Sequence, residues 1–127
     1  MKQRKNKEVS SQELSHLVAK GMLEKKGLDI VILDLRKVKN AVADFFVLCS
    51  GTVDTHVDSV ADSVEAEVYK ATEIDPWQRE GKTNREWILI DYVDVVAHVF
   101  KRESREFYGL DELWGDAEVI HVDETFA

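Results

Sequence analysis

The chain has 127 residues, 44% of them hydrophobic, which suits one folded domain with a buried core. Its 25 acidic residues outnumber 17 lysines and arginines, and this net charge of −8 disfavours nucleic-acid phosphates and favours a basic partner. A single cysteine excludes an internal disulfide, and no uninterrupted apolar run is long enough to cross a membrane.

Residues 1–9 form a basic segment that we expect to be a flexible tail. It holds Lys2, Arg4, Lys5 and Lys7, so the rest of the chain is more acidic than the total charge indicates. The segment lacks the apolar stretch that follows the charges in a secretory signal. Together with the lone cysteine, this predicts a cytoplasmic protein.

Two helices and two strands are predicted in the first half of the chain. Ser10 and Glu13 have the spacing of a capping box, which begins a helix, and Gly27 suits the left-handed position that ends one. The apolar runs 30–33 and 44–49 are typical of buried strands. A long helix with a stripe of valine and alanine follows them, and these small side chains favour close packing against a sheet.

Three more strands and a helix are predicted in the second half. An edge strand is expected near 77–80, and the runs 87–90 and 95–100 are separated by a connection short enough for an antiparallel hairpin. Ser104 is expected to cap a helix that runs through Trp114.

This order of elements predicts an α/β domain with a mixed sheet of about five strands packed with helices. The domain is expected to span residues 10–114. No lysine or arginine follows Arg105, so residues 115–127 are expected to form an acidic C-terminal extension.

Each residue that could take part in catalysis, metal binding or phosphate binding also has a purely structural interpretation, which the sequence favours. Cys49 lies in an apolar run and is expected to be a packing cysteine, and the four histidines lack the close pairing of metal ligands. Asp91 and Asp94 could hold Mg²⁺, but their spacing crosses a turn and favours a solvated hairpin. The segment 50–52 could cradle a phosphate, but it lacks the lysine and glycines of a P-loop, and a helix cap explains it. We expect no cofactor and no metal.

Large aromatic residues gather in the second half of the chain, where base stacking would need cationic neighbours. Trp87 differs from the others because it opens an antiparallel strand after a polar loop, where one face could stay uncovered. Aromatic side chains at an acidic rim are typical of protein–protein hot spots. The aromatic residues of this region are Trp77, Trp87, Tyr92, Tyr108 and Trp114.

Several segments, in this order, resemble the family of ribosomal silencing factors, called RsfS or iojap. They cover most of residues 27–114, and together they are specific although each alone is weak. The segments are 29–34, 44–52, 56–57, 80–81, 87–92, 94–100, 105–108 and 110–114.

The resemblance implies a translational repressor that catalyses nothing. Such a protein binds a large-subunit ribosomal protein of the uL-fourteen type on the intersubunit face and blocks joining of the small subunit, which lowers translation during starvation. A role in subunit maturation and a homodimer in the free state are also implied, with a fold similar to nucleotidyltransferases that lacks their catalytic residues.

By position, Trp87 matches the tryptophan that opens the family's partner-binding strand. Two departures stand out: Val93 lies where relatives often have glycine, and Asp54 replaces a frequent serine, although an aspartate is still expected to cap a helix. The other residues implied in partner binding are Leu89, Asp91, Tyr92, Asp94 and His98.

Two alternatives stay open. The first is an Mg²⁺- and nucleotide-binding enzyme similar to nucleotidyltransferases, which would use Ser50, Thr52, Asp91 and Asp94. The second is a homodimerising scaffold with an unrelated partner. No membrane association and no nucleic-acid specificity are expected for any of these functions.

Overall fold

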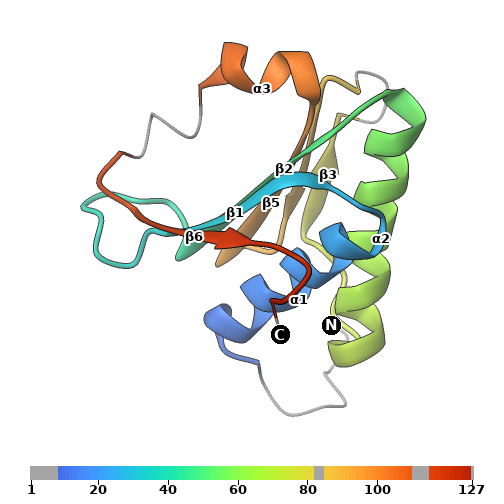
Figure 1. Ribbon diagram of the computed structural model, residues 1–127. Helices are drawn as coiled ribbons and strands as arrows, with labels where there is room; N and C mark the ends of the chain where they lie inside the picture. Colours follow the sequence, from blue (N-terminus) through green and yellow to red (C-terminus); the bar gives the residue numbers. More distant parts are fainter. Residues whose placement is uncertain (1–8, 82–84, 110–114, 127) are drawn as a thin grey trace.

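A computed structural model describes residues 9–81, 85–109 and 115–126 of the chain (Figure 1). Within them the elements are α1 (Ser11–Glu24), β1 (Leu28–Asp34), β2 (Phe45–Gly51), α2 (Asp54–Thr72), β3 (Gln78–Glu80), β4 (Trp87–Asp91), β5 (Val95–Lys101), α3 (Arg102–Tyr108) and β6 (Glu118–Val122). The expected basic tail lies almost wholly outside the described residues.

The strands form one mixed sheet in the order β3-β4-β5-β2-β1-β6, which confirms the predicted α/β class. The pair β2–β5 is parallel, and the other neighbours are antiparallel, including the predicted β4–β5 hairpin. The short edge strand predicted after α2 is present as β3.

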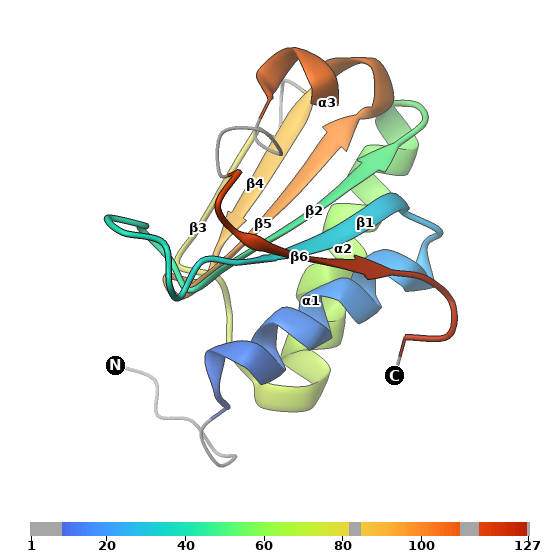
Figure 2. The ribbon, with the colours of Figure 1, turned by 60° about the vertical axis from the view of Figure 1, so that its left-hand side comes forward.

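The sixth strand, β6, was not predicted, because it lies in the segment expected to be an acidic extension. It pairs antiparallel with β1, with Ile30 opposite Val122 and Asp34 opposite Glu118 (Figure 2). Its alternation of polar and apolar residues is short and interrupted by the apolar pair Val119 and Ile120, so the strand depends on the edge that β1 offers. Long-range pairing of this kind leaves little signal in local sequence.

Both long helices lie on one face of the sheet, while α3 lies across one end of it (Figure 1). The predicted capping box is confirmed, since the Glu13 N–H donates to Ser10 Oγ at 3.0 Å and the Ser10 N–H donates to Glu13 Oε1 at 3.0 Å. The helices approach closely at Gly21, where a Cβ would lie 2.7 Å from the Val64 Cα. A larger residue there would force α1 away from α2.

Three helix boundaries differ from the sequence expectation. The left-handed residue after α1 is Lys26, with φ 60°, and not Gly27. Val53 is the N-cap of α2, so Asp54 is the first helical residue, where its carboxylate forms an ion pair with Lys101 at 3.0 Å. The last helix begins before Ser104, and the rest of its predicted course, through Trp114, falls outside the described residues.

The sheet buries apolar side chains on both faces. The core under α1 and α2 is largely aliphatic and includes Cys49, whereas the opposite face carries Phe46, Phe100 and Trp87. None of the helices in the described residues is both long and apolar enough to span a membrane.

Candidate macromolecule-binding face

Alternation along β4 places Trp87, Leu89 and Asp91 on the face of the sheet that α1 and α2 leave free. Ile88 and Ile90 point the other way and are fully buried beneath the helices. The three outward residues of β4 are each only partly buried. A strand with one open face was expected from the polar loop before Trp87, and the strand geometry agrees with that expectation.

The neighbouring strands build an aromatic layer around Trp87. Its ring stacks on Phe100 of β5 with centroids 5.2 Å apart, and Phe46 of β2 meets His98 edge-on at 4.6 Å. Phe100 is fully buried, so the indole covers the core on one side and is partly open on the other. Such a residue can become fully desolvated when a partner docks.

His98 holds the Trp87 ring in place and is itself buried. The Trp87 indole N–H donates to His98 Nδ1 at 3.1 Å, so the imidazole carries its proton on Nε2. Among the described residues no group bonds to this Nε2. Burial lowers the pKa of His98 to about 3, so the ring is neutral at physiological pH.

The hairpin turn beside this face presents two carboxylates. Asp91 accepts the Val93 N–H at 2.7 Å, and Asp94 is exposed while its carbonyl accepts the Asp44 N–H at 2.8 Å. Val93 has φ 78°, a left-handed conformation that glycine adopts at lower cost than valine. The pair thus serves a turn, and in the described part of the chain no three acidic, histidine or cysteine residues meet in a metal-binding cluster.

Tyr92 does not share this face, contrary to the grouping expected from sequence. The alternation after β4 turns its ring into the core under α2, where it is nine-tenths buried. Burial raises the pKa of Tyr92, and the carboxylates of Glu65 and Asp75 raise it further. A partner on the β4 face would meet Trp87, Leu89 and Asp91 but not this phenol.

The segment 50–52, weighed as a phosphate cradle, is closed by the protein's own side chains. The Thr52 N–H donates to His56 Nδ1 at 2.9 Å, and His56 Nε2 donates to the Lys25 carbonyl at 2.8 Å. Arg105 donates to Ser50 Oγ at 3.1 Å and to the Asp29 carbonyl at 2.7 Å. The segment is a junction between elements, and it does not cap α2, whose N-cap is Val53.

Cys49 is also structural, as its place in an apolar run predicted. It is fully buried beside Gly27, and burial raises the pKa of the thiol to about 12, so no thiolate forms at neutral pH.

Sequence reasoning gave Trp77 no role, although this residue is 71% exposed in the structure. It lies directly before β3, and its backbone N–H donates to the Asp91 carbonyl at 2.8 Å, which places it beside the acidic turn. The available signal was its context: a tryptophan between Pro76 and Gln78, in a polar stretch without an apolar partner at strand spacing.

These features define a small α/β domain, with helices on one side of a mixed sheet and a partly open aromatic strand with an acidic turn on the other. A family model described as "Ribosomal silencing factor during starvation" matches residues 8–127. The chain belongs to this family, RsfS.

Similarity to individual proteins supports the same family assignment. The ribosomal silencing factor RsfS of Halalkalibacterium halodurans is 34% identical over 115 residues, covering 91% of this chain and 97% of the relative. A crystal structure of a protein from Chromobacterium violaceum matches with a TM-score of 0.79 at 32% identity. The match covers 84% of this chain and 88% of the chain in that structure. A mouse protein named "Mitochondrial assembly of ribosomal large subunit protein 1" is 34% identical over 74 residues, which are 56% of this chain and 32% of that protein.

Proposed function

We propose that this RsfS-family protein represses translation by binding a basic protein of the large ribosomal subunit, of the uL-fourteen type, on the intersubunit face. Bound there, it keeps the small subunit from joining. The action is steric and cytoplasmic, and it lowers translation when nutrients are scarce. The name of the mouse relative, which refers to the large subunit, supports that subunit as the target.

The observation that carries the proposal is the half-buried indole of Trp87 on a strand that also presents Leu89 and Asp91. An aromatic anchor whose polar end is already bonded can be buried by a partner without leaving its N–H unpaired, since His98 accepts it at 3.1 Å. Carboxylates at the rim complement a basic ribosomal surface and speed its encounter. We therefore propose Trp87, Leu89, Asp91 and Asp94 as contacts, with His98 positioning the indole.

Catalysis is not part of this function. The residues that an enzyme of the nucleotidyltransferase type would use are engaged in structure: Ser50 bonds Arg105, Thr52 bonds His56, and Asp91 bonds the turn. A homodimer in the free state is compatible with the same proposal, because a second copy could cover the β4 face until the ribosome replaces it.

The test is co-sedimentation with isolated large subunits, followed by an assay of subunit joining. Trp87→Ala should weaken binding by about 1–4 kcal/mol and relieve the block to the same degree. Tyr69→Ala is the matched control, because it truncates another partly exposed aromatic, on α2. Each variant is first checked for a cooperative thermal transition, and a folded Trp87→Ala protein that binds like the control would remove this residue from the site.

A further inference from the structure

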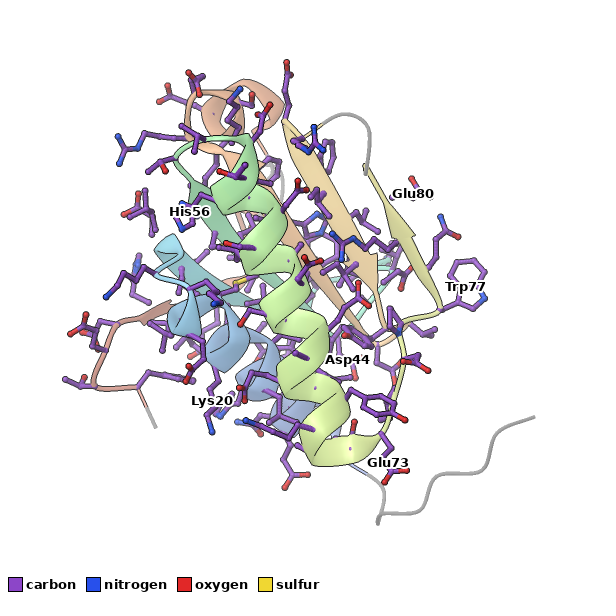
Figure 3. The ribbon with its side chains drawn as sticks, turned by 90° about the vertical axis from the view of Figure 1, so that its right-hand side faces the viewer. Lys20, Asp44, His56, Glu73, Trp77 and Glu80 are labelled. Carbon is purple, nitrogen blue, oxygen red and sulfur yellow. The ribbon has the colours of Figure 1, made fainter. Side chains whose placement is uncertain are left out.

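An exposed tryptophan marks one end of the molecule. Trp77 projects away from the body at the edge of β3 (Figure 3), and 71% of it is accessible. Its backbone is bonded to Asp91, and the turn that follows carries Val93, which is 60% exposed. One exposed apolar residue thus lies within the acidic hairpin turn, and an exposed tryptophan lies beside it.

The same end of the molecule is rich in carboxylates. Asp44, whose N–H bonds the Asp94 carbonyl, belongs to it together with the residues around Trp77 and the turn. Of the cations near Trp77 in sequence, Lys70 and Arg79 are already paired with Glu67 and with Asp62 and Glu65, and Arg36, whose charge interacts with Asp44, is paired with Asp34. The carboxylates of this end are Asp44, Glu73, Asp75, Asp91 and Asp94. The occupant that this charge fits is basic.

The first helix begins at this end. Ser11 Oγ donates to Asp44 Oδ2 at 2.8 Å, which fixes the entry of α1 beside the carboxylate that also adjoins the turn. The residues before it carry Lys2, Arg4, Lys5 and Lys7. From Val9 back to Lys2 an extended chain spans up to about 25 Å. The target lies close to its starting point, because the Asp44 backbone bonds Asp94 at one end of the hairpin turn and the Trp77 backbone bonds Asp91 at the other.

We propose that the basic segment 2–7 docks onto this acidic, tryptophan-marked end of its own chain. Its cations pair with Asp75, Asp91 and Asp94, and one of them lies over the Trp77 indole, where a cation is attracted by the ring face. Each exposed pair is weak, but tethering supplies an effective concentration on the order of millimolar. The contact is therefore partial, reversible and sensitive to salt.

Docking of the segment covers the carboxylates that the ribosomal partner is proposed to meet. The segment is thus an internal competitor, which a stronger basic surface displaces. This consequence rests on the proposed function, whereas the docking itself does not. The docking also gives a role to the basic segment 2–7 in a chain that is otherwise acidic.

The docking is tested on the free protein by ¹H–¹⁵N correlation spectra. The indole N–H signal of Trp77 is assigned with Trp77→Phe, and the full chain is compared with the variant Lys2→Gln, Arg4→Gln, Lys5→Gln, Lys7→Gln. We expect this variant to shift the Trp77 indole and the Val93 and Asp94 amides, and about 1 M salt to shift the unaltered chain in the same way.

A matched variant changes the same charge elsewhere: Lys20→Gln, Lys25→Gln, Lys26→Gln, Arg102→Gln. It should leave those three signals in place. The proposal is overturned if the first variant also leaves them in place. It is overturned equally if the shift depends on protein concentration, because the segment would then bind a second copy.

Competition is tested with isolated large subunits at low salt. The tail-neutralised variant should bind about 3- to 10-fold more tightly than the unaltered chain, and the matched variant should not. Equal binding by all three, with the spectral shift present, would overturn the competition. If none of the three binds subunits while the shift persists, the proposed function fails and the docking stands.

Discussion

Two histidines in this molecule receive a hydrogen bond on the same ring nitrogen but differ at the other. His56 accepts the Thr52 N–H on Nδ1 and donates from Nε2 to the Lys25 carbonyl, which ties the start of α2 to the end of α1. His98 accepts the Trp87 indole on Nδ1, and its buried Nε2 has no bond within the described residues. His56 is partly exposed and joins two elements with both ring nitrogens, whereas the buried His98 leaves one nitrogen unbonded at a cost in stability.

The pH dependence of stability gives the largest expected contrast. The pKa of His98 falls from about 6.5 in the unfolded chain to about 3 in the folded one, so between these values the unfolded state binds more protons. Stability therefore rises with pH across this window, is complete above pH 6.5 and is lost as the pH falls. At pH 5 the effect should be about 2 kcal/mol.

Urea unfolding at pH 7 and pH 5 measures this effect by comparison with His98→Phe, which keeps a ring between Phe46 and Phe100. The unaltered protein should lose about 2 kcal/mol more than the variant between the two pH values. Equal losses in both proteins would mean that His98 becomes protonated in the folded state without penalty, and the contrast between the two histidines would disappear.

Removing the satisfied histidine should cost less, but at every pH. His56→Ala deletes two hydrogen bonds whose partners, the Thr52 N–H and the Lys25 carbonyl, remain accessible to water, so we expect a destabilisation of about 0.5–1.5 kcal/mol. The exposed His121 on β6 provides the control, since His121→Ala should change stability by less than about 0.5 kcal/mol. Once folded, the His56 variant should bind large subunits normally.

Much of this architecture could be predicted from local patterns. The capping box, the buried strands, the valine and alanine stripe and the β4–β5 hairpin all have signals within a few residues. β6 and the His56 clamp have none, because each depends on a partner distant in sequence: β1 in one case and the end of α1 in the other. The open face at Trp87 was expected from its place at the start of an antiparallel strand after a polar loop, and strand alternation, applied one residue beyond the strand, would have removed Tyr92 from the site.

The strained turn beside the site provides a gain of stability. Val93 adopts φ 78°, which a β-branched residue tolerates poorly, so Val93→Gly should stabilise the fold by about 1 kcal/mol in urea unfolding. Val119→Gly is the matched change at another exposed valine, which lies within β6 and does not have a positive φ, and there glycine should destabilise. A loss of stability at Val93 would show that the side chain contributes more than its backbone costs.

Neutralising the two carboxylates of the hairpin turn should have the smallest effect on stability but a clear effect on binding to large subunits. Asp91→Asn with Asp94→Asn keeps an oxygen that can accept the Val93 N–H, and the unfolding free energy should change by less than about 0.5 kcal/mol. Removing two rim charges should nevertheless slow association with large subunits and flatten its dependence on salt. If the association rate and its salt dependence stayed unchanged, the acidic turn would serve the hairpin alone, and recognition would rest on the aromatic strand.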